Sequence, residues 1–223
     1  MSNRELFLYE ELMLLALKDR KGTMVDSTMY KYAFGGAVLA ELLMSGRIRM
    51  ETTGKKGKKQ IVRPVDPTPI GDPLLDECLE TVSEREKPRT PGAWVERMAN
   101  TKDLKHRVAS QLSRKGILRA KEDKVLGIFS RKVYPELDPD PEREITARIE
   151  SAILQKGGAV TPKTAVLVAL AHHTGLLKMV MDKARLKTYK DRIKQIAEGE
   201  ATAEATKEAI EAMHAAMIAV TAS

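Results

Sequence analysis

Apolar residues recur at helical spacing through most of the chain. Leu8, Leu12 and Leu15 lie on one face of a helix predicted over residues 6–18. The same period predicts a second helix over residues 28–45, and residues 165–177 form the most apolar segment, which predicts a buried central helix. Further helices are predicted over residues 71–82, 91–98, 102–115, 140–156 and, with a break near Gly199, 178–222.

Alternating apolar and polar residues predict two β-hairpins. The first lies near residues 46–65, around a turn at residues 54–57, and the second lies near residues 117–134. Few strands among many helices indicate a mainly α fold. We expect one domain over residues 1–223, with a helical core decorated by small β-hairpins.

The segment Gly71–Val82 (GDPLLDECLETV) predicts the start of a helix most clearly. Asp72 can cap the helix, and Pro73 suits the first helical position, where no N–H group is needed. Leu75 and Leu79 then mark one apolar face. These features alone predict an ordinary capped amphipathic helix.

Composition narrows the class of protein. Hydrophobic residues make up 43% of the chain, which is enough for a core, and Cys78 is the only cysteine, so no internal disulfide pair can form. No apolar run approaches the roughly 20 residues needed to span a bilayer. Glu10 and Glu11 interrupt the apolar segment near the N-terminus, so a secretion signal is not expected. We expect a soluble, cytosol-facing protein.

A net charge of +7 predicts an anionic partner, either nucleic acid or an anionic membrane. The basic residues gather in two clusters, which are Lys55, Lys56, Lys58, Lys59 and Arg63, and then Lys102, Lys105, Arg107, Arg114 and Lys115. Lys102 and Lys105 are three residues apart, so in a continuous helix they share a face and can reach one phosphate group together.

No pattern predicts an active site. Neighbouring helical histidines such as His172 and His173 point about 100° apart, and no further ligand follows at metal-site spacing. Cys78 falls within an apolar helix pattern, which favours a buried thiol over a nucleophile. The Gly54–Lys59 stretch lacks the spacing and the strand-to-helix context of a nucleotide-binding phosphate loop. We expect no enzyme activity, no cofactor and no metal.

Several motifs, in order along the chain, resemble those of the Golgi phosphoprotein 3 (GPP34) family. Residues 71–82 are similar to its "GDxLLDExLxxV". The other similar segments are residues 15–22 (LALKDRKG), 39–42 (LAEL), 46–48 (GRI), 93–96 (AWVE) and 112–118 (LSRKGIL). The resemblance covers roughly residues 6–160, and the C-terminal third fits in its helical character.

This resemblance implies a largely helical fold with hairpins and a peripheral membrane protein that recognises phosphatidylinositol 4-phosphate in a basic pocket. Eukaryotic members act at the Golgi, where they help to retain glycosyltransferases as client proteins. The resemblance also implies self-association through the hairpin over residues 121–134. The long basic N-terminal arm of eukaryotic members has no counterpart before the first predicted helix, so the sequence looks like the bacterial branch. A cytoplasmic protein that associates peripherally with membranes is expected.

By position, Lys102 and Lys105 match two arginines of the family's pocket and are the expected lipid-headgroup ligands. The pocket's tryptophan falls near Val25 or Asp26, and its third arginine falls at Gly35. The charge of two ligands is thus retained, while the planar guanidinium fork is lost.

An alternative prediction is a nucleic-acid-binding protein. Two helices followed by the basic hairpin from Arg47 to Arg63 are also the order of a winged-helix domain. Against it, the second predicted helix, residues 28–45, offers only Lys31 as a basic residue, and a recognition helix normally carries more polar side chains.

Overall fold

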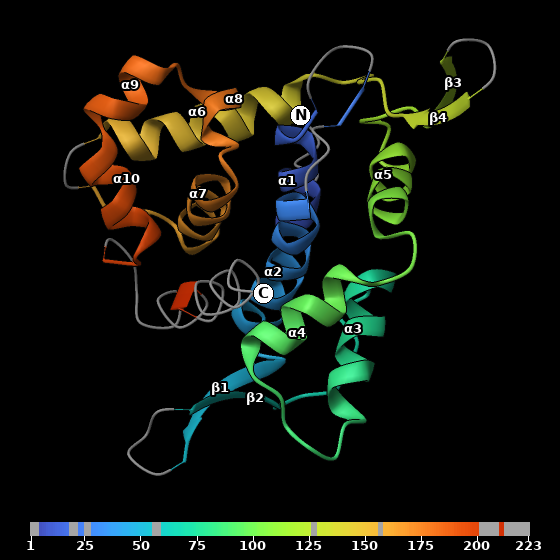
Figure 1. Ribbon diagram of the computed structural model, residues 1–223, viewed down its shortest axis with the longest axis vertical. Coiled ribbons are helices and arrows are strands. Elements are labelled where there is room, and N and C mark those ends of the chain that lie inside the picture. The colour runs from blue at the N-terminus through green and yellow to red at the C-terminus, as the bar shows by residue number, and fades with distance from the viewer. Residues whose placement is uncertain are drawn as a thin grey trace.

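The computed structural model describes residues 5–17, 22–24, 28–54, 59–125, 129–155, 158–200 and 210–211. The side chains of Thr28 and of residues 122–131 lie outside this description. Figure 1 shows a body of packed helices with two hairpins at its periphery. The predicted mainly α fold with small hairpins is confirmed.

The bounds of the elements are close to those expected from the sequence. In chain order the helices are α1 (Leu8–Leu15), α2 (Thr28–Met44), α3 (Pro73–Ser83), α4 (Pro91–Ala99), α5 (Leu104–Arg114), α6 (Asp140–Leu154), α7 (Pro162–Thr174), α8 (Leu177–Val180), α9 (Lys183–Thr188) and α10 (Lys190–Ala197). The strands are β1 (Ile48–Thr53), β2 (Lys59–Pro64), β3 (Lys121–Val125) and β4 (Phe129–Val133).

The core is built around α1, α2 and α7. α2 packs against α1, α4 and α7, and α7 is buried on every side from Thr164 to Ala171. A helix surrounded by protein needs no polar face, which explains the continuous apolar run in this part of the sequence. The predicted buried central helix is confirmed, and it ends at Thr174, followed by Gly175 in the left-handed conformation (φ 73°).

α3 begins as its sequence predicts. Asp72 accepts hydrogen bonds from the N–H groups of Leu74 (3.0 Å) and Leu75 (2.9 Å), and Pro73 occupies the first helical position. The second Asp72 oxygen accepts a hydrogen bond from Gln111 Nε2 of α5 at 2.7 Å. The cap therefore also fixes α5 against α3.

Both hairpins are antiparallel pairs. In the first, Ile48 pairs with Pro64 and Thr53 with Lys59. An isolated two-stranded hairpin is only marginally stable in water, and this one is backed by α3 and α4, which contact β2. In the second, Lys121 pairs with Val133, and Figure 1 shows this hairpin projecting beyond the helical body near α5.

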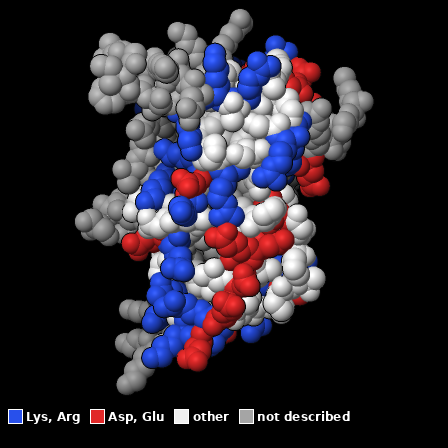
Figure 2. All heavy atoms as spheres, turned by 90° about the vertical axis from the view of Figure 1, so that its right-hand side faces the viewer, with Lys and Arg blue, Asp and Glu red and all other residues white. Residues whose placement is uncertain are grey.

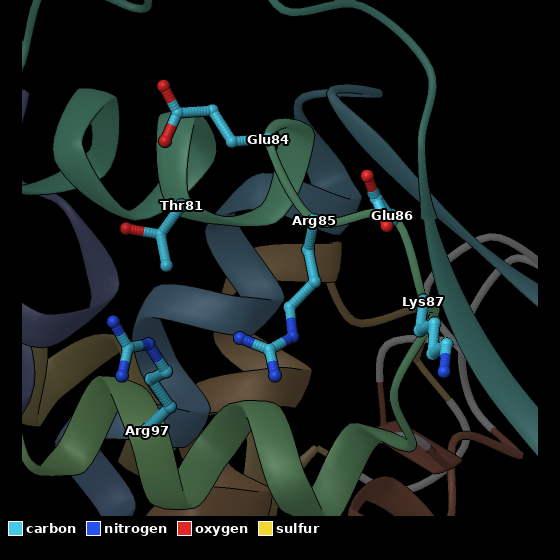
Figure 3. Close-up of a pocket in the computed structure, with 6 residues that line it drawn as sticks. All are labelled: Thr81, Glu84, Arg85, Glu86, Lys87 and Arg97. Carbon is cyan, nitrogen blue, oxygen red and sulfur yellow. The ribbon is translucent and has the colours of Figure 1, made fainter.

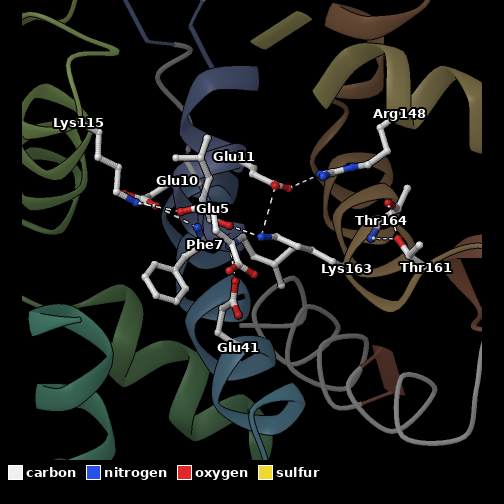
Figure 4. Close-up of polar contacts among 12 residues, drawn as sticks. Glu5, Phe7, Glu10, Glu11, Glu41, Lys115, Arg148, Thr161, Lys163 and Thr164 are labelled. Carbon is white, nitrogen blue, oxygen red and sulfur yellow. Dashed lines mark hydrogen bonds and ion pairs between the residues drawn. The ribbon is translucent and has the colours of Figure 1, made fainter. Parts of the chain in front are cut away.

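Buried carboxylates hold α1 in place (Figure 4). Glu10 accepts hydrogen bonds from the Phe7 N–H group at 2.9 Å and from Lys115 Nζ, beyond the end of α5, at 2.6 Å. Glu41 of α2 accepts a hydrogen bond from the Leu8 N–H group. Removing one partner of a buried ion pair such as Glu10–Lys115 lowers the free energy of unfolding by about 3–5 kcal/mol, because the other charge is left without compensation. Two further ion pairs reach α6 and α7, namely Glu11–Arg148 (2.5 Å) and Glu11–Lys163 (3.5 Å).

The C-terminal third is more broken than its pattern predicts. In place of a helix from Lys178 to a break near Gly199, three short helices (α8, α9 and α10) turn at Met181–Asp182 and at Tyr189. Asp182 caps α9 by accepting from the Arg185 N–H group at 2.9 Å, which marks the new start. Ile210, within the last part of the predicted helix, is buried, while Met213, Met217 and Val220 lie outside the described residues.

Candidate functional site

The two lysines expected to bind a headgroup lie at the connection between α4 and α5. Asn100 is the C-cap residue of α4, and α5 begins after Asp103. Asp103 has a left-handed backbone (φ 54°), unlike every other described residue except glycines. A non-glycine residue in this conformation costs of order 1–3 kcal/mol and persists only where the surrounding structure fixes it. The connection is therefore a defined turn.

Lys102 is exposed in this turn, and Lys105 is half-buried in the first turn of α5. The expectation that both lie on one face of a continuous helix is wrong, because the left-handed Asp103 separates them. α5 begins at Leu104, and Asp103 makes no side-chain hydrogen bond to its first N–H groups. The positive end of the helix dipole thus lies between Lys102 and Lys105 in the sequence. It adds to the attraction of the two lysines for an anion.

Lys31 brings a third positive charge to the same turn. Its Nζ, reaching from α2, donates a hydrogen bond to Asn100 Oδ1, two residues before Lys102. The sequence did not single out Lys31 as a site residue, because 69 residues separate it from Asn100. The one available signal was that Lys31 is the sole basic residue of its helix.

Gly35, where the resemblance places the family's third arginine, has no room for any side chain. A Cβ atom built there would lie 2.4 Å from the Val95 carbonyl oxygen and 2.8 Å from the Ala99 nitrogen, both backbone atoms of α4. Contacts this short require the backbone to move. Lys31 lies one helical turn before Gly35 on α2, so the helix still supplies a cation from a neighbouring position.

Arg107 belongs to the structure of α5 and not to the free surface. It forms an ion pair with Glu77 of α3 (2.7 Å) and donates to the Pro73 carbonyl oxygen (3.3 Å). Leu104, Val108 and Leu112 of α5 are buried. Together these contacts fix the helix that carries Lys105.

Figure 2 shows the face that includes this region. Lys and Arg side chains run along one side of the face and gather over its upper half, while a band of Asp and Glu side chains crosses its lower half. Exposed acidic residues of α3 and its C-terminal cap include Glu77, Glu80 and Glu84. Basic side chains dominate the upper half of this face and lie beside the acidic band in its lower half, so the upper half attracts an anion most strongly.

Cys78, His172 and His173, the residues weighed above as catalytic or metal-binding groups, make structural contacts. Cys78 is buried, as expected, and burial raises the pKa of its thiol to about 12, so the thiol stays protonated and unreactive at neutral pH. The His173 ring nitrogen Nδ1 lies 2.8 Å from the Ala169 carbonyl oxygen of its own helix, and its ring contacts His172 edge-on. Within the part of the chain that the structure describes, no three His, Cys, Asp or Glu side chains gather as metal ligands.

Three of the expected features lie outside the described residues. These are the positions of the family's tryptophan (Val25 or Asp26), the basic tip of the first hairpin (Lys55, Lys56 and Lys58) and the tip of the hairpin expected to self-associate (residues 126–128, with the neighbouring side chains).

The arrangement of α2 speaks against a winged-helix protein. A recognition helix must present one face to a groove of DNA. α2 instead packs against α1, α4 and α7, and its residues from Ala33 to Ala40 include buried Phe34 and Val38. The helix that precedes the basic hairpin is therefore a core element.

Comparison with known proteins agrees with the motifs. The Golgi phosphoprotein 3 (GPP34) family matches residues 8–213. A curated relative is vacuolar protein sorting-associated protein 74 of Eremothecium gossypii, with 28% identity over 167 residues, which cover 68% of this chain and 50% of that protein. The chain thus spans about half the length of this relative. The match extends over almost the whole chain and includes every element from α1 to α10, so the protein belongs to the Golgi phosphoprotein 3 family.

Proposed function

We propose that this protein is a non-catalytic adaptor that binds anionic lipid headgroups at the α4–α5 connection. The observation that carries the proposal is the meeting of Lys31 from α2 with the turn that bears Lys102, beside the uncapped start of α5. Lys105, in the first turn of α5, adds the third ammonium group of the proposed site. Membership of the Golgi phosphoprotein 3 family supports the same role.

Electrostatics supports a membrane surface as the place of action. Each lysine or arginine held near an anionic leaflet contributes about 1 kcal/mol to binding. A phosphomonoester headgroup carries a charge of about −1.5 to −2 at pH 7 and suits two or three ammonium groups. Within the described residues, no helix is both long and apolar enough to cross a membrane. Attachment through surface charge is therefore consistent with the described helices.

Phosphatidylinositol 4-phosphate is the headgroup that the family resemblance suggests. Lysines are mobile point charges and lack the planar fork with which arginine grips phosphate. We therefore expect this protein to prefer anionic over neutral membranes strongly, and to distinguish one phosphoinositide from another less sharply than a site built from arginines.

Vesicle sedimentation tests the proposal. The protein is mixed with neutral phosphatidylcholine vesicles and with vesicles that contain phosphatidylserine or phosphatidylinositol 4-phosphate. Lys102→Glu with Lys105→Glu is expected to weaken binding to both anionic vesicles at least about 30-fold, since neutralising two lysines alone removes about 2 kcal/mol. The melting temperature should hardly change, because Lys102 is exposed and Lys105 half-buried.

Lys183→Glu with Lys187→Glu is the matched control. Both residues are exposed on α9, which Figure 1 places on the other side of the helical body from α5, and the change in net charge is the same. The control should bind vesicles nearly as well as the unchanged protein. Equal, negligible binding to anionic and neutral vesicles, or equal losses in the two double variants, would refute the proposal.

We also propose that the β3–β4 hairpin takes part in self-association, as the family resemblance suggests. The hairpin projects from the helical body (Figure 1), where a second copy can reach it. Sedimentation velocity over a range of protein concentrations, with and without the hairpin tip, tests this. Client proteins in such an adaptor would bind elsewhere on the same helical body.

A further inference from the structure

A groove lies between the C-terminal end of α3 and the helix α4. It consists of two adjoining cavities of about 450 and 200 Å³. Thr81 of α3 and Arg97 of α4 line both cavities, so the two adjoin at these residues. A volume of this size matches a small-molecule ligand.

Two arginines face each other in the larger cavity. Figure 3 shows the guanidinium groups of Arg85 and Arg97 extending into the space between the helices from opposite walls. The Thr81 hydroxyl lies on the same side, while the Glu84 carboxylate projects away from the space. The Thr81 hydroxyl donates to the Glu77 carbonyl oxygen at 2.8 Å and keeps its capacity to accept a hydrogen bond.

Neither guanidinium has a counter-ion within the described part of the chain. None of the ion pairs or side-chain hydrogen bonds found there includes Arg85, Arg97 or the neighbouring Lys87. Arg107, on α5, differs because Glu77 neutralises it at 2.7 Å. Both arginines are exposed to solvent and Glu86 also lines this cavity, but two guanidinium groups that point into one space still favour an anion between them.

Trp94 lines the smaller cavity. It is buried to 1% exposure, and its indole Nε1 atom is closed off from solvent. The residue therefore offers a ligand an aromatic wall and not a hydrogen bond.

We propose that this groove binds a phosphate ester, with the phosphate held between Arg85 and Arg97 and the rest of the ligand directed towards Trp94. A tetrahedral phosphate can accept paired hydrogen bonds from each planar guanidinium, which favours phosphate over a carboxylate with its two oxygens. Lys102 of the proposed headgroup surface lines the smaller cavity, but the phosphate ligands proposed here are different side chains, Arg97 of α4 and Arg85 of the α3–α4 connection, so the site goes beyond that surface. The ester is either a soluble metabolite or the headgroup of a lipid.

Trp94 is the only tryptophan of the chain, so its fluorescence reports on the groove directly. Pyrophosphate and glycerol 3-phosphate are titrated into the full-length protein at constant ionic strength, with potassium chloride as the reference, and calorimetry provides a second measure of Kd. We expect saturable binding that Arg85→Ala and Arg97→Ala each weaken tenfold or more, since a hydrogen bond to a charged group is worth about 1.5–3 kcal/mol. Arg97→Lys should weaken binding less.

The matched control is Arg89→Ala. Arg89 lies in the same α3–α4 connection but lines neither cavity, so this variant should keep the Kd of the unchanged protein. The proposal is overturned if calorimetry finds no saturable binding of either phosphate compound, or if Arg89→Ala weakens binding as much as Arg85→Ala.

Vesicles that contain phosphatidic acid separate the two sources of phosphate. If Arg85→Ala lowers both vesicle and pyrophosphate binding, the ligand is a lipid headgroup; if it lowers pyrophosphate binding alone, the ligand is soluble. Either result supports the groove. Lys105→Glu, outside both cavities, should reduce vesicle binding but retain pyrophosphate binding, so failure of the headgroup surface and failure of the groove are distinguishable.

Discussion

The two carboxylate oxygens of Asp72 have different partners. One caps α3 through the N–H groups of Leu74 and Leu75, and the other accepts from Gln111 of α5. One buried residue therefore determines both where α3 begins and how α5, with Lys105 in its first turn, is placed beside it.

Asp72→Ala is expected to lower the free energy of unfolding by about 2–4 kcal/mol, since a lost N-cap and an unpaired buried amide act together. Equilibrium urea unfolding measures this. Asp72→Asn is the control, because Asn keeps the capping oxygen. Gln111 Oε1, which has no partner in the described part of the chain, can then accept from the new amide. Equal losses in both variants would contradict this account of the cap.

At the scale of single elements, the segment that joins β4 to α6 carries a titrating pair. Burial, together with the Glu142 carboxylate in the first turn of α6, raises the pKa of Glu136 to about 7. The folded state therefore holds a proton that the unfolded chain releases near pH 4.5. The stability that comes from this proton is present at low pH and is lost as the pH rises through the folded pKa.

Glu136→Gln mimics the protonated carboxyl at every pH. Its free energy of unfolding, relative to that of the unchanged protein, should therefore rise between pH 5 and pH 8. Urea unfolding of both proteins across this range measures the difference, in which the contributions of titrating groups other than the coupled Glu142 cancel. A difference that is independent of pH would show that Glu136 titrates in the folded state as it does in the unfolded chain.

Most elements were predictable because their signals are local. Asp72 with Pro73 starts α3, Thr161 with Pro162 starts α7, and Gly175 follows its end. The turn at Asp103 was not predictable. The apolar spacing of α5 continues through this turn without a break, and the left-handed φ of Asp103 leaves no mark in the sequence. The breaks between α8, α9 and α10 do not follow from the apolar spacing, although Asp182 offers the N-cap signal of α9.

The candidate site was predictable only in part. Lys102 and Lys105 were found from motif position, and their neighbourhood in sequence already pointed to a basic cluster. Lys31 reaches them through a contact across 69 residues, and Arg85 meets Arg97 only because α3 and α4 fold side by side. Such pairs depend on tertiary packing, which periodicity does not encode.

At the scale of the whole molecule, the net charge of +7 is distributed unevenly. On the face shown in Figure 2, basic side chains dominate the upper half, and in the lower half they lie beside a band of acidic side chains. A uniform positive surface would attract any polyanion equally, whereas an uneven one orients the molecule towards an anionic surface.

This layout predicts how binding depends on salt. The Debye length falls from about 10 Å at 0.1 M to about 3 Å at 1 M salt, so a protein attracted by its overall field alone should lose all vesicle binding at high salt. The contacts that Lys31, Lys102 and Lys105 make with a bound headgroup are screened less by salt.

We expect binding to vesicles that contain phosphatidylinositol 4-phosphate to weaken between 0.05 and 0.5 M sodium chloride with a slope that Lys31→Gln reduces. Lys183→Gln, an exposed residue on α9, should leave the slope unchanged. Sedimentation at five salt concentrations measures these slopes, and identical slopes for the two variants would show that the field of the whole molecule, and not this site, attracts the membrane.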